Sequence, residues 1–435
     1  MNIEKADFII KNIHILTMDG EKRQYKNGVI AITGDTISYI GDNMPHMDAK
    51  NIIDGKGKIA LPGLINTHTH SAMIIFRGYG NDLPLWDWLS KKMWPLEDQL
   101  TAQDAYWLSL LAMAEMIQSG TTTFSDMYMF MDKTAEATSS SGMRAVLARG
   151  LQGPDDKSNL RMEETKSLYK DWHNGANGRI RVRVAPHAIY TCSTKYLKEC
   201  IKLAISLDTG MHTHVSETHK EVEDCLKANG KTPVKYLYDL GFFDLPSIAA
   251  HCVHLNDEDI DLLKEKNVQI AHCPASNLKL ASGIAPIPKL VKNGINVALG
   301  TDGASSNNNL SMMKEMNLTS IIHKGITGDP TIIPAPYALE MATINGARAL
   351  NWQDEIGSLE KGKKADVILV DTSAPHWQPI NDIPSNMVYS SQSSDIDTVI
   401  VNGKILMEDG ILKTIDLDRV YYEVNRIRDN LMFQS

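Results

Sequence analysis

The sequence predicts an α/β protein: a (β/α)8 TIM-type barrel with a small β-sandwich domain formed by both chain ends. Three observations predict this fold. The middle of the chain alternates eight apolar, β-rich runs with longer amphipathic stretches, and strands that alternate with helices form parallel βαβ units. Both ends are rich in short strand-like runs. Polar side chains recur where the middle strands end, which is where a barrel carries its chemistry.

Strand-like runs near both termini indicate the smaller domain. They are β-branched and roughly alternating, as half-buried strands are. Asn402-Gly403, inside the last of them, is typical of a hairpin turn. The runs are 7–18, 28–40, 365–370 and 398–406.

The domain boundaries follow from this pattern. A chain of 435 residues is long enough for one large domain and a smaller one. We expect the N-terminal part of the β-sandwich at 1–57 and the barrel at 58–357. The C-terminal part of the sandwich, with a terminal helix, is expected at 358–435.

The middle of the chain supplies the barrel. Amphipathic stretches such as 102–118 and 193–206 separate its apolar runs, and the absence of a fixed-period repeat disfavours a solenoid. The eight runs are 59–70, 121–126, 145–149, 181–187, 210–215, 247–251, 268–272 and 296–301. The polar residues at or just after their ends are His68, His70, Asp126, Arg149, His187, His214, His251, His272 and Asp302.

Composition and charge exclude several classes of partner. A net charge of −9 repels the phosphate backbone of nucleic acids. No secretory leader and no membrane-spanning run is visible, and five scattered cysteines are typical of free thiols in a reducing compartment. We expect a cytoplasmic protein with a small-molecule substrate and no nucleic-acid or membrane partner. A homo-oligomer is possible on the general frequency of such assemblies.

His68 and His70 end the first barrel strand. Residues two apart share one face of a strand, so both imidazoles can point into the barrel mouth and meet one ion. Imidazole suits zinc and other borderline metals. A bare His-x-His also fits two surface or capping histidines, but matching histidines at other strand ends favour a metal site.

The fifth strand ends in His212-Thr213-His214, followed by Glu217. The two histidines share a face, and a metal site needs only one of them as its third ligand. A carboxylate at Glu217 can reach a substrate bound over the metal. The alternative is an ordinary acid at a helix N-terminus, which the helix dipole favours.

The eighth strand ends in Leu299-Gly300-Thr301-Asp302. Asp302 can bind the metal and accept a proton from water, although an Asp in a Gly-rich turn is also common. Three histidines, one aspartate and an open position form a catalytic pattern, because structural zinc sites close their coordination shell. A bound metal would lower the pKa of water toward about 7 and supply hydroxide at neutral pH.

Two further strand-end histidines have less direct roles. We read His251 as a group that orients the hydroxide and stabilises developing charge, ahead of nearby His254. We interpret His272 as a structural strand-end residue. His219-Lys220-Glu221 has the H-x-E form of the cytidine-type deaminases, but no P-C-x-x-C follows it.

Five segments together resemble the amidohydrolase superfamily over essentially the whole chain. The resemblance implies a metal-dependent hydrolase on a barrel with a split β-domain. Binuclear members often carry a carboxylated lysine after the fourth strand, whereas that strand ends here in His187, with Lys195 deeper in the next helix. We therefore expect one metal per chain, by default Zn²⁺, with Fe²⁺ and Mn²⁺ also possible. The segments are PGLINTHTH, HTHVSET, AHCVHL, HCPASN and LGTDGASSNN.

Within the superfamily, the sequence is most similar to members that deaminate the adenosine-type nucleosides 5′-methylthioadenosine and S-adenosylhomocysteine. The resemblance implies hydrolysis of a cyclic amidine C–N bond, which gives the inosine analogues and ammonia. The implied metal ligands are His68, His70, His214 and Asp302. The implied substrate contacts are Glu97, Arg149, His187, Glu217 and Asp302, and the implied catalytic groups are Glu217, His251 and Asp302.

Each implied contact has a physical reason. A carboxylate at Glu97 can accept hydrogen bonds from both ribose hydroxyls. The planar fork of Arg149 suits the carboxylate of a homocysteine tail, or else it supports the pocket. His187 can donate to a purine ring nitrogen. The side chains of Trp86, Trp88 and Trp94 form an apolar wall or pack within their loop.

The implied mechanism divides the proton transfers among three residues. Glu217 begins protonated and gives its proton to ring N1. Asp302 takes the proton of the attacking water, and His251 stabilises the oxyanion. The alternative is a related amidohydrolase on another N-heterocycle, of the triazine chlorohydrolase or guanine deaminase type. A non-enzymatic metal-binding protein would be expected to have lost members of this set.

Overall fold

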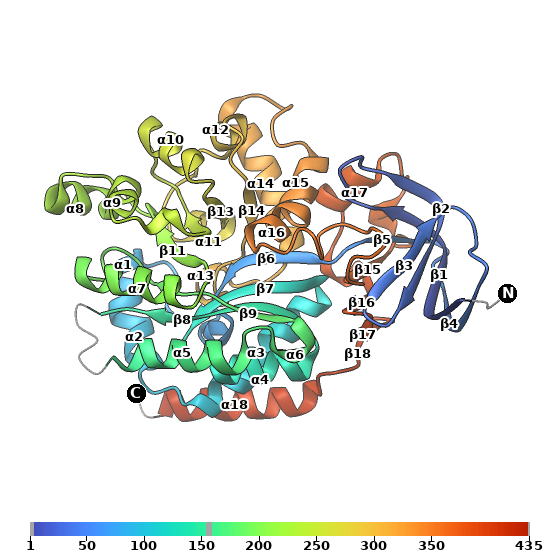
Figure 1. Ribbon diagram of the computed structural model, residues 1–435, viewed down its shortest axis with the longest axis horizontal. Coiled ribbons are helices and arrows are strands. Elements are labelled where there is room, and N and C mark those ends of the chain that lie inside the picture. Colours follow the sequence, from blue (N-terminus) through green and yellow to red (C-terminus); the bar gives the residue numbers. More distant parts are fainter. Residues whose placement is uncertain (1–3, 154–158, 434–435) are drawn as a thin grey trace.

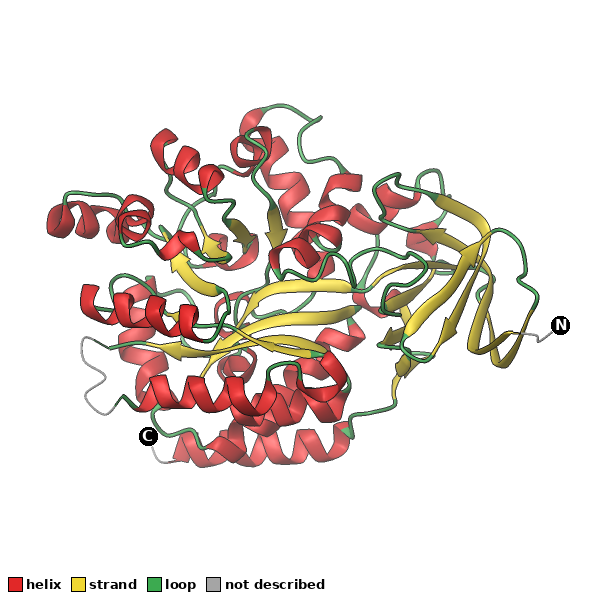
Figure 2. Ribbon diagram, in the orientation of Figure 1, coloured by secondary structure: helices red, strands yellow, loops and turns green. Residues whose placement is uncertain are grey.

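The computed structural model describes residues 4–153 and 159–433. The predicted fold class is confirmed: parallel strands surrounded by helices form a barrel, and a mixed sheet stands beside it (Figures 1 and 2). Both chain ends supply strands to that sheet, and the C-terminal helix returns to the barrel (Figure 1).

All eight predicted barrel runs are strands, arranged in two parallel arcs. The arcs meet through a parallel bridge between Val184 and Met211 and through Asp302, whose N–H donates to the carbonyl of His68 at 2.9 Å. One arc contains β6 (Leu64–Thr69), β7 (Thr121–Tyr128), β8 (Arg144–Leu151), β9 (Ile180–Val182) and β10 (Ala185–Pro186). The other contains β11 (Met211–Val215), β12 (Ser247–His251), β13 (Gln269–His272) and β14 (Val297–Leu299).

The first predicted run, 59–70, is two strands that belong to different sheets. β5 (Lys58–Pro62) pairs with β15 in the mixed sheet, and β6 opens the barrel. The chain crosses between them at Gly63, where a Cβ would lie only 2.0 Å from Thr122 Oγ1. A glycine is therefore needed at this crossing.

The mixed sheet has nine strands in the order β18-β17-β16-β15-β5-β1-β2-β3, with β4 beside β1. Its side chains pack into an aliphatic cluster that joins both chain ends, with Ile13, Ile30, Val367 and Ile400 among its members. The remaining strands are β1 (Glu4–Leu16), β2 (Gln24–Thr33), β3 (Thr36–Gly41), β4 (Met47–Asp54), β15 (Val367–Asp371), β16 (Ile396–Val401), β17 (Lys404–Glu408) and β18 (Ile411–Leu412).

Helices cover the outside of the barrel (Figure 2). Many begin at a capping side chain: Thr101 accepts from Asp104 N, and Ser193 accepts from Tyr196 N. The longer helices are α3 (Ala102–Gln118), α4 (Met131–Ser141), α5 (Leu160–Trp172), α7 (Thr194–Ser206), α8 (His219–Asn229), α10 (Asp257–Glu265), α14 (Met312–Thr327) and α18 (Leu417–Phe433).

Shorter helical segments lie between these elements. They are η1 (Ser71–Phe76), α1 (Leu85–Trp88), the π-helix η2 (Leu89–Met93), α2 (Trp94–Glu97), α6 (Gly175–Gly178), α9 (Pro233–Asp239), η3 (Phe242–Asp244), α11 (Pro274–Lys279), α12 (Ile287–Lys292), α13 (Ala304–Asn307), α15 (Ala335–Met341), α16 (Ile344–Ala349), η4 (Pro375–Trp377), α17 (Ile383–Tyr389) and η5 (Ser393–Asp395). Within the described part of the chain, no helix has the length and apolarity to cross a membrane.

A buried ion pair ties the barrel to the mixed sheet. Arg144 of β8 donates from Nε to Asp366 Oδ2 at 2.9 Å, and the same carboxylate accepts from Asn402 N at 2.8 Å. Both charged side chains are buried, and removal of one partner from a buried ion pair strongly destabilises the folded protein. The sheet is thus held in a fixed place on the barrel.

Candidate active site

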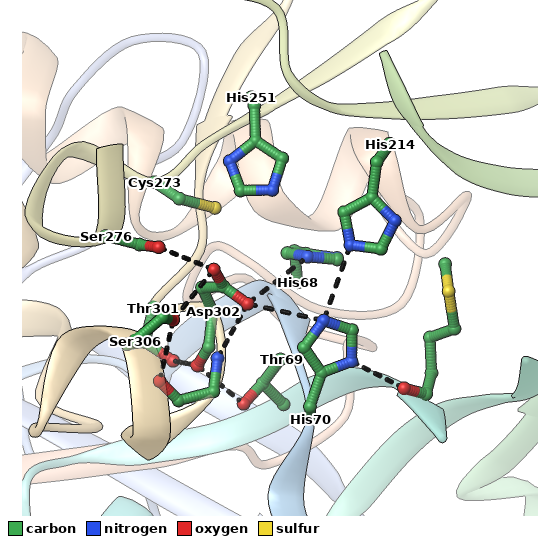
Figure 3. A network of polar contacts seen from close by, with 12 residues as sticks. His68, Thr69, His70, His214, His251, Cys273, Ser276, Thr301, Asp302 and Ser306 are labelled. Atoms are coloured by element: carbon green, nitrogen blue, oxygen red, sulfur yellow. Dashed lines mark hydrogen bonds and ion pairs between the residues drawn. The ribbon is translucent and has the colours of Figure 1, made fainter. Parts of the chain in front are cut away.

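Three imidazoles meet at the mouth of the barrel, from strands on opposite arcs. His68 lies in β6, His70 directly follows that strand, and His214 lies in β11; their ligand atoms all lie within 4.8 Å of one another. The carboxylate of Asp302, just after β14, completes the group (Figure 3). Gly300 permits this approach, because a Cβ there would lie 2.9 Å from the Cβ of His68.

The facing atoms of this cluster are metal-binding atoms. His70 Nε2 lies 3.4 Å from His214 Nε2. Asp302 Oδ1 lies 3.3 Å from His70 Nε2 and 3.7 Å from His68 Nε2. Three ring nitrogens and one carboxylate oxygen therefore converge on one point.

Backbone carbonyls set the orientation of two of these imidazoles. The Nδ1 of His70 lies 2.5 Å from the carbonyl oxygen of Met127, and the Nδ1 of His214 lies 2.7 Å from that of His187. A carbonyl only accepts, so each Nδ1 carries the hydrogen and each Nε2 presents a lone pair to the centre.

His68 is oriented by a second histidine instead of a carbonyl. Its Nδ1 lies 3.0 Å from His212 Nε2, and His212 Nδ1 lies 3.4 Å from Ser125 Oγ. His212 therefore stands behind His68, and His214 is the fifth-strand histidine of the cluster. The Nε2 of His68 is buried and has no hydrogen-bond partner among the described residues.

These observations fit a divalent metal ion at the cluster. A buried ring nitrogen without a partner is unfavourable unless something binds it. Burial, followed by the neighbouring imidazoles, lowers the pKa of His68 and of His214 well below the usual value. The neutral imidazole that results is the form that binds metals.

Asp302 is held in a fixed orientation by hydrogen bonds from its surroundings. Its Oδ2 accepts from Ser276 Oγ at 2.6 Å and from Ser306 Oγ at 2.9 Å. Its Oδ1 accepts from Gly303 N at 2.7 Å. Burial alone would raise its pKa, but the His70 and His251 imidazoles and the hydrogen bonds from Ser276 and Gly303 outweigh burial and lower it. The carboxylate is therefore ionised and aimed at the cluster.

Glu217 and His251 form the adjoining wall of the site. Glu217 Oε2 lies 3.8 Å from His251 Nε2, and Ser282 Oγ donates to Glu217 Oε1 at 3.4 Å. Both residues are buried, and burial raises the pKa of Glu217. The Nδ1 of His251 lies 2.8 Å from Asn277 Oδ1, and His251 has a positive φ of 72°. Such strain in a non-glycine residue is typical of functional sites.

A cavity of about 90 Å³ extends from the cluster. Its wall combines apolar side chains with a few polar groups, as small-molecule sites do. Its apolar lining includes Met73, Leu85, Trp88, Leu89, Trp94 and Leu280. Its polar lining includes His70, Glu97, Arg149, His187, His214, Glu217, His251 and Asp302.

Glu97, at the end of α2, is a third carboxylate in the wall of the cavity, besides Glu217 and Asp302. Tyr128, the last residue of β7, donates its hydroxyl to Glu97 Oε1 at 2.8 Å. Burial raises the pKa of Glu97, against the effect of this hydrogen bond. Because one tyrosine hydroxyl leaves much of the accepting capacity of a carboxylate unused, Glu97 can also accept from a diol.

Arg149 and His187 also line the cavity. Arg149 Nε donates to Glu164 Oε2 at 2.5 Å, and its Nη1 donates to the carbonyl of Gly150 at 2.7 Å. His187 Nδ1 lies 3.0 Å from Thr191 Oγ1. Burial lowers the pKa of His187 to about 3, so its ring is neutral.

Not every strand-end residue faces the cavity. Asp126 accepts from the backbone N–H of Ser71 at 3.0 Å and also from the Ser71 hydroxyl, so it caps η1 instead. His272 is buried away from the cavity lining, and its ring lies 5.5 Å from that of His323. Trp88 and Trp94 line the cavity, whereas Trp86 is 53% exposed.

Sequence reasoning missed the residues that support the cluster. Some of them lie in the segments HCPASN and GASSNN, whose serines and asparagines were visible but not tied to partners far along the chain. The missed residues are Ser125, Tyr128, Glu164, Ser276, Asn277, Ser282 and Ser306.

Comparisons with known proteins agree with the geometry. The model of the amidohydrolase family matches residues 59–406. A 5-methylthioadenosine/S-adenosylhomocysteine deaminase of Caldanaerobacter subterraneus subsp. tengcongensis is 54% identical over 98% of this chain and 99% of its own length. The protein of the same description from Thermoanaerobacter pseudethanolicus is 52% identical, with 98% and 99% covered.

Solved structures share the fold over the whole chain. An adenosine deaminase from Xanthomonas campestris with bound zinc has a TM-score of 0.95 and 31% identity, with 99% of this chain and 100% of that one covered. An atrazine chlorohydrolase from Arthrobacter aurescens complexed with zinc has a TM-score of 0.90 at 24% identity, with 97% and 100% covered. The second likeness bears on the fold alone.

Proposed function

This chain belongs to the amidohydrolase family, and from that premise we propose that it deaminates adenosine-type nucleosides. The substrates are 5′-methylthioadenosine and S-adenosylhomocysteine, and the products are their inosine analogues and ammonia. One observation carries the proposal. A single cavity joins a cluster suited to a metal, the buried acid Glu217 and the carboxylate of Glu97. The relatives that are about half identical over nearly the whole chain have this activity in their names.

One divalent ion per chain is held by His68, His70, His214 and Asp302 in this proposal. When bound, the ion lowers the pKa of water and supplies a nucleophile near neutral pH. Zinc is the proposed metal, because nitrogen and carboxylate ligands suit it and the adenosine deaminase neighbour contains it. Fe²⁺ and Mn²⁺ accept the same ligands.

Three residues carry the proton transfers at C6 of the purine. Glu217 starts protonated and gives its proton to N1, which makes C6 electrophilic. Asp302 accepts the proton that the attacking water loses, and His251 donates a hydrogen bond to the oxygen that develops charge at C6. Asp302 then passes the proton it accepted to the exocyclic amine, the C6–N bond breaks and ammonia leaves, while the C6 hydroxyl forms the carbonyl and returns its proton to Glu217. The raised pKa of Glu217 and the lowered pKa of Asp302 support these opposite roles.

The remaining polar groups of the cavity recognise the ribose, a purine ring nitrogen and the homocysteine tail. Glu97 accepts hydrogen bonds from the ribose hydroxyls, and the neutral ring of His187 donates to a purine nitrogen. Arg149 meets the carboxylate of the homocysteine tail. That carboxylate must either bind Arg149 alongside Glu164 or displace Glu164, whose side chain is partly exposed.

We place the enzyme in the cytoplasm, since its five cysteines are all free.

A substrate panel tests this function. Purified protein with measured metal content is offered 5′-methylthioadenosine, S-adenosylhomocysteine, adenosine, guanine and atrazine, and ultraviolet change and ammonia release are followed together. We expect the highest kcat/KM on the two thioether nucleosides. Turnover confined to guanine or atrazine would instead assign the alternative, an amidohydrolase of the guanine deaminase or triazine chlorohydrolase type.

A further inference from the structure

The carboxylate of Glu221 points back from α8 to the backbone of Glu217. Its Oε2 accepts from Glu217 N at 2.8 Å, and its Oε1 accepts from Ser216 N at 2.9 Å. The residue is 4% exposed and is absent from the lining of the active-site cavity among the described residues. Both oxygens of a buried acid are thus used to hold the strand-to-helix turn that carries Glu217.

This arrangement differs from an ordinary helix cap. In a capping box, the acid at the third helical position bonds to the N–H of the capping residue itself, and Asp259 in α10 does so with Asn256 N at 3.1 Å. Thr218 caps α8 and accepts from Glu221 N at 3.2 Å. The Glu221 carboxylate, however, passes Thr218 and reaches the two residues before it.

The turn that Glu221 holds is strained. Ser216 is not a glycine, yet its φ is +51°, and such a conformation persists only where its surroundings enforce it. Its carbonyl accepts from Val253 N at 3.1 Å and from His254 N at 2.9 Å. The turn is therefore held on one side by the segment that follows β12 and on the other by Glu221.

We propose that Glu221 is a positioning residue that fixes the Glu217 carboxyl against the purine ring through the backbone N–H groups of Ser216 and Glu217. The inference rests on the proposed function, because it assigns Glu217 the proton transfer to N1. Burial raises the pKa of Glu221 to about 7. A buried position is unfavourable for an acid. The presence of Glu221 there agrees with a role in binding the backbone N–H groups of Ser216 and Glu217.

Asp259→Asn is a matched control for Glu221→Gln. Both acids lie at the third position of a helix, both are buried, and both accept from backbone N–H groups. Asp259 is outside the active-site lining and also accepts from the Thr232 hydroxyl, so its substitution reports on helix capping and on that local contact. We expect both variants to lower Tm and only Glu221→Gln to lower kcat.

The experiment is a cycle of kcat and KM measurements on 5′-methylthioadenosine below the Tm of every variant. We expect Glu221→Gln to reduce kcat about 10²-fold, since small misplacements of a catalytic group have effects of that size, with little change in KM. Asp259→Asn should stay within about twofold of the parent. In the Glu217→Gln background, Glu221→Gln should add no further loss, because the group it positions is already inactive.

A second variant at the same position keeps the inference testable if Glu221→Gln folds poorly. Glu221→Asp keeps the charge on a shorter side chain and should give an intermediate kcat. Full kcat in both Glu221 variants, an equal loss in Asp259→Asn, or a loss that multiplies with that of Glu217→Gln would overturn the inference alone. A parent protein with its metal that releases no ammonia from 5′-methylthioadenosine would instead overturn the proposed function.

Discussion

Oε2 of Glu217 lies 3.8 Å from Nε2 of His251, with both side chains buried at the wall of the cavity. Burial raises the pKa of Glu217. Burial would lower the pKa of His251, but the carboxylates of Glu217 and Asp302 outweigh it and raise that pKa. Two titratable groups therefore stand side by side next to a metal-binding cluster, which agrees with the proton transfers proposed for deamination at a purine ring.

Substitution of Glu217 tests the proton transfer to N1. General acid–base catalysis typically contributes about 10²–10⁴-fold, so Glu217→Gln should lower kcat on 5′-methylthioadenosine by that factor. Its metal content, measured by elemental analysis, should equal that of the parent, because Glu217 is outside the cluster. Near-parental turnover in this variant would refute the role assigned to Glu217.

The pH dependence of kcat tests the same group independently. In the proposed mechanism Glu217 works as an acid, so its active form is the protonated one. A pKa raised by burial extends that form to higher pH, and kcat should hold up to this pKa and fall above it. The falling limb should disappear in Glu217→Gln. A kcat that instead falls as the pH is lowered through the pKa of Glu217 would contradict the assignment.

Removal of His70 tests the metal cluster. His70→Ala deletes one of the converging nitrogens, so metal and activity should be lost together on dialysis. His272→Asn is the control, because His272 also ends a barrel strand but does not line the cavity. A full metal complement in His70→Ala would remove His70 from the ligand set.

Arg149→Ala tests recognition of the amino-acid tail. S-adenosylhomocysteine carries a carboxylate that 5′-methylthioadenosine lacks, and a charged hydrogen bond is typically worth about 1.5–3 kcal/mol. The variant should therefore lose about tenfold or more in kcat/KM on S-adenosylhomocysteine and much less on 5′-methylthioadenosine. Equal losses on both substrates would make Arg149 a support of the pocket through Glu164.

Tyr128→Phe tests recognition of the ribose. It deletes the hydroxyl that donates to Glu97 Oε1 and leaves the ring in place. We expect KM for 5′-methylthioadenosine to rise about tenfold, the effect of a lost hydrogen bond to a charged group. A 2′,3′-dideoxy analogue, which has no diol to bind, serves as the control. A similar rise in KM for that analogue would show that Tyr128 acts on something other than Glu97.

Strand geometry explains how much of the site could be predicted from sequence. Residues two apart in a strand share a face, so the alternation of side chains alone places His68 and His70 together. The same rule makes His212 and His214 equal candidates for the third ligand. They are distinguished only in the folded chain, where His212 packs behind His68 and His214 faces the cluster. The barrel strands were predictable because they lie in distinct apolar runs, although the run 181–187 holds both β9 and β10.

The remaining features depend on contacts between distant segments. Asp126 lies near the end of a barrel strand just as His214 does, but its carboxylate accepts from the backbone N–H of Ser71. The hydrogen bond from Ser276 to Asp302 joins neighbouring barrel units. Glu221 resembled part of an unrelated deaminase motif, and its contact with the Glu217 backbone became visible only in the folded chain.

Direct analysis of the reaction products tests the central claim. The metal-containing protein is incubated with 5′-methylthioadenosine, and the purine product is identified by mass spectrometry while ammonia is quantified in the same sample. The proposed function predicts 5′-methylthioinosine and ammonia in equal amounts. Unchanged substrate, or cleavage of the nucleoside into adenine and a sugar without ammonia, would contradict it.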